Sequence, residues 1–289
     1  MNAHSHEAMP DKATPGPATP ADHPTGGAGA PRPRRRWRRI ALRVLLVLLA
    51  LLLAAVVGLV VWAKTGVMAA EEQPLAAVRA NPAISWAEDE AAITLTPADG
   101  VHPDVPGLVF YPGAKVEAAA YAARLADLVT DHHMTVVIAK PTLNLALFDL
   151  RGIDAFTGDA AEVRQWLVGG HSLGGVRACM LAPEQAGLVL FASYCTNDLS
   201  EAQVPVLSLS GGQDGLSTPA KVADHRDTLP AGALMVEIPE ANHAAFGDYG
   251  PQSGDGVGTA SDEQMNAAIT EAAGELLTRM QGAHPEAAR

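Results

Sequence analysis

Short apolar runs alternate with amphipathic segments along most of this 289-residue chain. Such runs are typical of buried strands, whereas apolar positions spaced three and four residues apart indicate a helix that packs on one face. Segment 117–130 has the helical spacing, with Tyr121, Leu125, Leu128 and Val129 on one face. The segments expected to be strands are 91–96, 108–111, 135–139, 166–168, 188–194, 204–210 and 233–238. The first of them alternates in polarity and should be half-exposed.

Two later helices have recognisable starts. Thr218 precedes Pro219, which is a cap followed by a proline at the first helical position, and Ser261 with Gln264 forms a capping box. Strands and helices that alternate in this way predict an α/β fold with a doubly wound, mostly parallel sheet.

One apolar run is too long for a strand. Residues 44–63 are twenty residues without a charge, and they span about 30 Å as a helix, which is the thickness of a bilayer's hydrocarbon core. Seven arginines precede the run, so the positive-inside rule keeps the amino terminus in the cytoplasm and places the following domain outside. We therefore expect a single-pass anchor in the cell membrane, with residues 40–63 in contact with the lipid bilayer. A signal peptide that is removed at residues 67–69 is the alternative.

Composition divides the chain into five parts. The expected parts are a disordered basic cytoplasmic tail (1–39), the transmembrane anchor (40–63), a linker (64–83), a globular domain (84–281) and a short C-terminal tail (282–289). The first tail contains His4, His6 and His23 but almost no large apolar side chains, so we interpret these histidines as solvated and not as metal ligands.

Charge is distributed unequally over these parts. The chain has 20 basic and 32 acidic side chains, of which residues 1–63 hold 8 and 3, so residues 64–289 hold 12 and 29 and have a net charge of −17. A domain this acidic is a poor nucleic-acid binder. We expect no nucleic-acid partner and read the arginine cluster as a membrane topology signal.

The sequence GHSLGG at residues 170–175 follows the apolar run 166–168. It contains the pattern G-x-S-x-G, and its position predicts a sharp turn from a strand into a helix that exposes the hydroxyl of Ser172. A serine in such a turn is a candidate nucleophile. The alternative is that Ser172 is an ordinary turn serine. A base and an acid placed nearby would argue against that alternative.

Two candidate partners follow in chain order. Asp214 comes just after the predicted strand 204–210, and His243 comes just after the predicted strand 233–238. The carboxyl ends of parallel strands share one rim of a sheet, so Ser172, Asp214 and His243 should converge there as nucleophile, acid and general base. Asp198, after the strand 188–194, is the competing carboxylate. His171 should pack beneath the turn.

The segments 170–175, 210–214 and 242–243, with FYPGA at 110–114, resemble the α/β-hydrolase superfamily. The segments 110–116 and 243–252 are similar to a bacterial group of small, lidless hydrolases that resemble dienelactone hydrolases in size. The resemblance covers about residues 84–281. It implies the α/β-hydrolase fold and a Ser-His-Asp triad, and it favours Asp214 over Asp198 because SGGQDG matches the family's acid turn.

An oxyanion needs two preorganised donors. The backbone N–H of Leu173, at the start of the helix, is one candidate. The turn Pro112-Gly113-Ala114 stands where relatives have a His-Gly segment, so the resemblance makes the N–H of Ala114 the second. Pro112 replaces that histidine and supplies no N–H. Lys115 is interpreted as solvated, with attraction of an acidic substrate group as the alternative.

Several elements of other enzymes are not expected. The gap between Tyr194 and Val204 is too short for a cap domain, so the site should be open to a small or medium ester, or to the end of a long one. No cofactor, metal or obligate protein partner is predicted. The glycine-rich segment 247–258 is interpreted as a flexible rim and not as a calcium loop. Cys179 and Cys195 are expected to be two buried thiols, with a single bridge as the alternative.

The function predicted from these residues is a membrane-anchored serine hydrolase that cleaves carboxylic esters through an acyl-enzyme. An acyltransferase on the same triad is one alternative, because it differs only in what accepts the acyl group. A binding protein that keeps the hydrolase fold without turnover is the other alternative, and the presence of Ser172, Asp214 and His243 argues against it.

Overall fold

A computed structural model of the chain describes residues 34–283. Most of the predicted tails 1–39 and 282–289, with His4, His6 and His23, lies outside the described residues. The remaining parts are helical and not disordered, since α1 begins at Arg34 and α6 ends at Ala283. The chain divides into two units between Leu53 and Ala54, within helix α1 (Arg34–Lys64).

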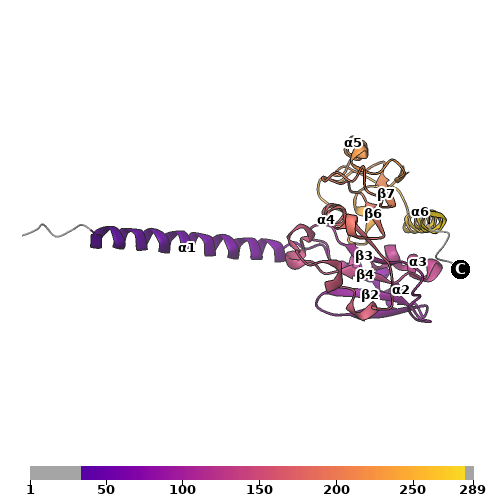
Figure 1. Ribbon diagram of the computed structural model, residues 1–289, viewed down its shortest axis with the longest axis horizontal. Coiled ribbons are helices and arrows are strands. Elements are labelled where there is room, and N and C mark those ends of the chain that lie inside the picture. The colour runs from indigo at the N-terminus through magenta and orange to yellow at the C-terminus, as the bar shows by residue number, and fades with distance from the viewer. Residues whose placement is uncertain (1–33, 284–289) are drawn as a thin grey trace, which may run out of the picture. The chain divides into compact units, whose positions relative to one another are not determined.

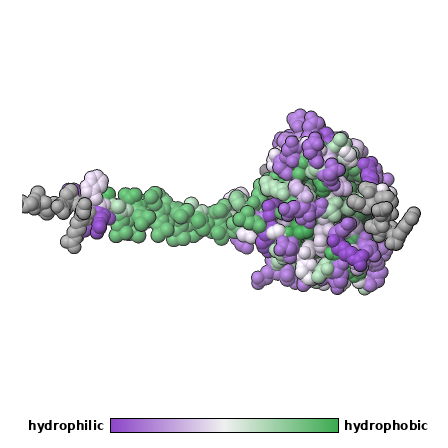
Figure 2. Space-filling model, viewed as in Figure 1, coloured by the Kyte–Doolittle hydropathy of each residue, from purple (hydrophilic) through white to green (hydrophobic). Residues whose placement is uncertain are grey.

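Helix α1 contains the predicted membrane-length run. Residues Arg36–Lys64 are long and apolar enough to cross a bilayer, and the large apolar side chains along them are exposed. Figure 2 shows the helix as an almost unbroken hydrophobic surface, in contrast to the mostly hydrophilic surface of the domain in that view. A fully exposed apolar helix is unstable in water, so α1 is a candidate transmembrane span.

The domain is built on one eight-stranded sheet with the order β1-β2-β4-β3-β5-β6-β7-β8. The strands are β1 (Ile84–Glu88), β2 (Ala92–Pro97), β3 (Gly107–Tyr111), β4 (Val136–Ala139), β5 (Trp166–His171), β6 (Gly187–Phe191), β7 (Val206–Gly211) and β8 (Leu234–Ile238). Strand β2 pairs antiparallel with both β1 and β4, and all the other pairs are parallel. The predicted mostly parallel α/β sheet is confirmed.

Helices cover both faces of this sheet (Figure 1). The α-helices of the domain are α2 (Glu72–Arg79), α3 (Ala122–His132), α4 (Leu173–Leu181), α5 (Pro219–Asp224) and α6 (Asp262–Ala283). The short 3₁₀ helices are η1 (Ala118–Tyr121), η2 (Thr142–Asn144), η3 (Ala146–Phe148), η4 (Ile153–Ala155), η5 (Gly158–Ala160), η6 (Ala182–Glu184), η7 (Arg226–Thr228) and η8 (Ala244–Phe246). One apolar core lies between the sheet and α3 with α6, and a second lies between the sheet and α4. Both faces are therefore buried, which explains why the central strands read as continuous apolar runs.

The observed elements differ from the predicted ones in three places. Strand β1, on the edge of the sheet, was not predicted, because its side chains are mostly exposed and show no apolar run. Strand β2 is buried on both faces and not half-exposed, because it lies between two strands and α3 packs against it. The predicted helix 117–130 begins as η1 and continues as α3. Both predicted helix caps, at Thr218 and at Ser261, are confirmed by their hydrogen bonds.

The predicted linker 64–83 is wrong for most of its length, because the domain begins at Met68. Met68 forms an isolated bridge with Val116, and its carbonyl accepts the N–H of Glu117 at 2.9 Å. The N–H of Glu71 donates to the carbonyl of Asp248 at 2.8 Å, and α2 packs against α3. The free connection between α1 and the domain therefore shortens to residues 65–67.

The cysteine prediction is also corrected. Cys179, in α4, and Cys195, in the loop after β6, are joined by a buried disulfide with a Cα–Cα distance of 5.5 Å. Two buried thiols were expected because two cysteines alone do not form a disulfide scaffold. The bridge closes a loop with a sequence separation of 16, and closing a loop of that size stabilises a domain by about 3 kcal/mol in the chain-entropy model.

A buried ion pair connects α3 to the C-terminal half of the domain. Arg124 lies 2.9 Å from Asp248 and 2.5 Å from Asp262, and its Nε donates to the carbonyl of Ala245 at 2.9 Å. Arg124 and Asp248 are 4% and 5% exposed, so the pair is desolvated. Burial raises the pKa of Asp248 from 3.8 to about 6 although Arg124 opposes this shift.

This pKa predicts how stability changes with pH. The folded chain binds the Asp248 proton more tightly than the unfolded chain does, so this group's contribution to stability is full below pH 4 and is lost as pH rises to about 6. The shift corresponds to about 3 kcal/mol. In detergent, the difference in unfolding free energy between wild type and Asp248→Asn should fall by about that amount between pH 4 and pH 7. Parallel pH profiles for the two proteins would contradict the assignment.

Candidate active site

The turn at Ser172 has the geometry expected of G-x-S-x-G. Ser172 joins β5 to α4 with φ 53° and ψ −123°, a backbone conformation that non-glycine residues rarely adopt. A side chain on Gly170 would clash with Gly174, and one on Gly174 would clash with the carbonyls of Tyr111 and Pro112. The glycines are required because the backbone segments approach too closely for a Cβ atom.

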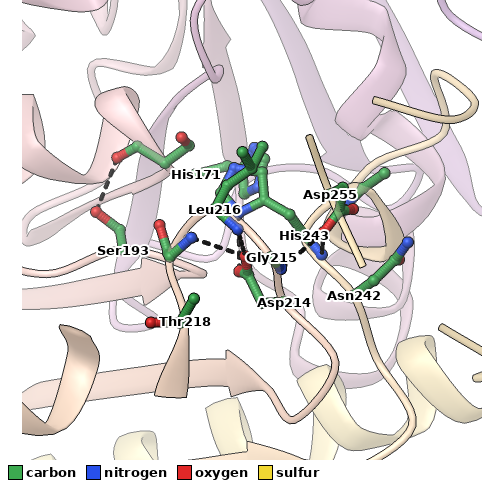
Figure 3. Close-up of polar contacts among 12 residues, drawn as sticks. His171, Ser193, Asp214, Gly215, Leu216, Thr218, Asn242, His243 and Asp255 are labelled. Carbon is green, nitrogen blue, oxygen red and sulfur yellow. Dashed lines mark hydrogen bonds and ion pairs between the residues drawn. The ribbon is translucent and has the colours of Figure 1, made fainter. Parts of the chain in front are cut away.

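Hydrogen bonds hold this strained turn in place. The N–H of Ser172 donates to the carbonyl of Phe191 at 3.0 Å. The hydroxyl of Ser193, which Figure 3 labels, donates to the carbonyl of Ser172 at 2.8 Å. Gly175 leaves room for Ser193, since a Cβ there would clash with the hydroxyl. Ser193 was not identified from the sequence, because nothing about a serine after β6 indicates that it supports a turn after β5.

Asp214 and His243 meet as predicted. Asp214 Oδ2 accepts a hydrogen bond from His243 Nδ1 at 2.8 Å, and both side chains are buried. Asp214 Oδ1 accepts the N–H groups of Leu216 and Ser217, each at 2.7 Å. With the proton on Nδ1, Nε2 carries the lone pair, and it has no hydrogen-bond partner among the described residues. The imidazole can therefore accept a proton at Nε2. The Ser172 hydroxyl is not hydrogen-bonded to this nitrogen in the structure, so of the three predicted residues the structure joins only Asp214 and His243.

Asp198 lies elsewhere. Its side chain is exposed and accepts the N–H of Ser200 at 2.9 Å. Hydrogen bonding to Ser200 lowers the pKa of Asp198. Of the two carboxylates considered from the sequence, only Asp214 bonds to His243.

The two proposed oxyanion donors belong to adjoining segments. Leu173 is the first residue of α4, so its N–H has no partner within the helix. The close approach of Gly174 to the carbonyls of Tyr111 and Pro112 brings the loop that contains Ala114 against the start of α4. No hydrogen bond joins the N–H of Leu173 or Ala114 to another residue in the part of the chain that the structure describes. Both groups remain available as donors.

A buried hydrogen-bond chain supports the loop of Ala114. The Tyr121 hydroxyl accepts the N–H of Gly113 at 3.0 Å and bonds to Nδ1 of His171 at 2.8 Å. The His171 side chain is buried, as its predicted packing role requires, and its ring centroid lies 4.4 Å from that of His243. Burial, with His243 nearby, lowers the pKa of His171 well below 6.5, so His171 stays neutral. His171 therefore acts as packing and as an acceptor for Tyr121.

Asp255 connects the loops that carry Asp214 and His243. Its Oδ1 accepts the N–H of His243 at 3.0 Å and of Gly215 at 3.1 Å, and its Oδ2 accepts the N–H of Ala244 at 2.9 Å. Figure 3 shows Asp255 beside the His243 loop. The segment 247–258 was expected to be a flexible rim, and this carboxylate instead fixes it to the site. The sequence offered no signal, because an aspartate among glycines is also typical of a mobile loop.

A separate cluster could hold a metal ion. The ligand atoms of Asp99, His102 and His133 lie within 4.8 Å of one another. This cluster is at the amino ends of the parallel strands, since His133 precedes β4, whereas Ser172 follows the carboxyl end of β5. It therefore has no part in chemistry at Ser172.

Comparison with known proteins assigns the fold. The alpha/beta hydrolase family matches over residues 107–267, so the chain belongs to this family. A structure described as a predicted CIB-like hydrolase from Thermoplasma acidophilum is similar, with 11% sequence identity and a TM-score of 0.47, and the match covers 64% of this chain and 97% of that chain. No curated protein matches. The domain has the α/β-hydrolase fold, and no cap domain is inserted within residues 34–283.

The hydrogen bonds of Asp255 predict a specific effect of Asp255→Asn. The asparagine side chain has one acceptor oxygen where the carboxylate has two. Its –NH₂ group would therefore face backbone N–H donors in the Gly215 loop or in the His243 loop, and those hydrogen bonds would be lost. Losing a charge-assisted bond costs about 2 kcal/mol, so amide hydrogen exchange at 213–217 or at 242–246 should accelerate tenfold or more. Asp159→Asn, at an exposed position, is the matched control and should change neither segment. Unchanged exchange in both segments of Asp255→Asn would show that this carboxylate does not hold the site together.

Proposed function

We propose that the protein is a membrane-anchored serine hydrolase that cleaves carboxylic esters. The observation that carries the proposal is the oriented imidazole of His243, whose Nδ1 bonds to buried Asp214 while its buried Nε2 has no partner among the described residues. Ser172 stands on a strained turn of the same family fold. An unpartnered buried nitrogen is costly in a protein interior, and a role in proton transfer accounts for it.

The proposed reaction has two halves. In the first, Nε2 of His243 takes the proton of Ser172 as the hydroxyl oxygen attacks the ester carbonyl, and the imidazolium then protonates the leaving alcohol. In the second, His243 takes a proton from a water molecule as its oxygen attacks the acyl carbon. The bond from that carbon to the Ser172 oxygen then breaks, the imidazolium returns its proton to Ser172, and the carboxylic acid leaves. Asp214 keeps the imidazole in the correct tautomer and stabilises its charged form.

Charge that develops on the substrate oxygen would be stabilised by the N–H groups of Leu173 and Ala114. Both N–H groups are free of other partners among the described residues, and the first is at the positive end of α4. Gly113 is held by Tyr121, which restrains the loop of Ala114 before substrate binds.

The surroundings of the site favour an open arrangement. The connection between β6 and β7 contains no helix. This is compatible with small or medium esters, and with long esters that present only one end. The same geometry also supports transfer of the acyl group to an alcohol or amine in place of water, and product analysis with competing alcohols separates these two outcomes.

The proposed location is the outer side of the cell membrane. Helix α1 is a candidate span, and the arginines before it favour a cytoplasmic amino terminus. The disulfide between Cys179 and Cys195 agrees with this orientation, since disulfides persist in oxidising compartments outside the cytoplasm.

Removing the nucleophile tests the reaction. Ser172→Ala should lower ester turnover by about a thousandfold or more while the fold is retained, because only binding and the oxyanion donors would remain. Labelling by a fluorophosphonate probe should disappear in this variant and persist in Ser253→Ala, an exposed serine used as the control. If neither wild type nor control is labelled, the alternative of a binding protein without turnover is the better description.

The two carboxylates can be compared directly. Asp214→Asn should reduce turnover by about a thousandfold, because the amide disrupts the tautomer and leaves the imidazolium without a counter-charge. Asp198→Asn should remain close to wild type, since Asp198 is exposed and, within residues 34–283, bonds only to Ser200. Both variants are assayed on one activated ester. The reverse ranking would place the acid after β6.

A further inference from the structure

One loop at the site exposes an unusual number of large apolar side chains. Leu147, Phe148 and Leu150 are 36%, 59% and 88% exposed. They lie within the connection between β4 and β5, and we refer to residues 145–150 as the apolar loop. Beyond α1, the other exposed large apolar side chains of the described residues are single positions distributed over the domain. A concentration of this kind marks a contact surface.

The apolar loop is exposed although its backbone is well held. Asp149 is buried and accepts the N–H groups of Thr142 and Arg151 at 3.1 Å, and it also pairs with the Arg151 side chain at 2.5 Å. The Arg151 carbonyl in turn accepts a hydrogen bond from Arg177 of α4 at 2.9 Å. Exposure of Leu150, between these two anchored residues, is therefore a feature of the fold and not a consequence of a loose loop.

The apolar loop adjoins the candidate active site. The carbonyl of Asn144, at its base, accepts the N–H of Lys115 at 2.8 Å, and Lys115 follows the proposed oxyanion donor Ala114. On the other side, η3 packs against α4, the helix that begins after Ser172. Leu173 is itself 39% exposed. The apolar loop therefore lies beside the two segments that carry the proposed oxyanion donors, Leu173 and Ala114.

The short connection after α1 keeps Lys115, and with it the apolar loop, near the end of that helix. Helix α1 ends at Lys64, and the N–H of Met68 donates to the carbonyl of Lys115 at 2.7 Å. Four residue steps span at most about 14 Å. Met68, whose N–H bonds to Lys115, therefore lies within about 14 Å of Lys64 at any angle between the helix and the domain. Asn144, the residue before the apolar loop, is hydrogen-bonded to that same Lys115.

We propose that the apolar loop inserts into the surface of the lipid bilayer, and that the site takes acyl esters from that surface. This rests on the proposed function, because it names where the ester is presented. The occupant is lipid because a helix of membrane length is attached within four residues of the rim. The net charge of −17 on residues 64–289 disfavours anionic lipid, so the expected surface is zwitterionic.

Insertion is tested first, without reference to activity. The tryptophan fluorescence of the full-length protein is measured in two kinds of phosphatidylcholine nanodisc, one with brominated acyl chains and one without bromine. The fluorescence added by Leu150→Trp should be quenched at least twofold. Met235→Trp, a control in β8 at the far edge of the sheet, should be quenched little. Equal quenching at the two positions, or none at Leu150→Trp, overturns the proposal. Emission from Leu150→Trp that instead changes with protein density would assign the loop to a second copy of the chain.

Substrate presentation is tested with two esters in the same nanodiscs. A variant with Leu147→Ser, Phe148→Ser and Leu150→Ser should hydrolyse water-soluble p-nitrophenyl butanoate within about twofold of wild type. Its rate of hydrolysis of a long-chain fluorogenic ester dissolved in the bilayer should fall at least tenfold. The control Met235→Ser should hydrolyse both esters at the wild-type rate. Equal effects on both esters overturn the presentation step. If wild type cleaves neither ester, the proposed function fails, while the quenching result still decides whether the loop inserts.

Discussion

The close approach between the start of α4 and the end of β3 is the constraint on which the candidate site depends. Gly174 lies so close to the carbonyls of Tyr111 and Pro112 that no side chain fits there. This contact sets the position of the loop that contains Ala114 relative to Leu173, and it leaves Ser172 in a left-handed conformation at the tip of the turn. The serine and both candidate oxyanion donors are thereby arranged by one packing contact between backbones.

The parts of the site that could be predicted are those with local causes. Glycines around Ser172 are required within one turn, and the contact between Asp214 and His243 follows from the rule that parallel strands end at a common rim. The strands of the central sheet were also predictable, because burial on both faces gives each a continuous apolar run. Local pattern and global fold agree at these positions.

The parts that could not be predicted depend on contacts between distant segments. Asp255 bonds to the N–H groups of His243 and Gly215, and Ser193 bonds to the carbonyl of Ser172, but neither residue stands in a periodic pattern. Docking of Met68 beside Lys115 is a pairing across more than forty residues of chain, and the prolines nearby indicated a linker. A carboxylate or a backbone amide can form hydrogen bonds with many different groups. Which group it bonds to is therefore determined by the fold and not by the residues next to it in the sequence.

The disulfide also has a consequence for how the site is assembled. Cys179 and Cys195 both precede β7 and β8, the strands that deliver Asp214 and His243. If the domain crosses the membrane in the order of its sequence, behind a cytoplasmic amino terminus, the two cysteines emerge while Asp214 and His243 are still inside. The segment around Ser172 can then be covalently secured before any proton acceptor reaches it. Catalytic competence would be the last property that the domain acquires, and a chain that stalls during export would carry an inert serine.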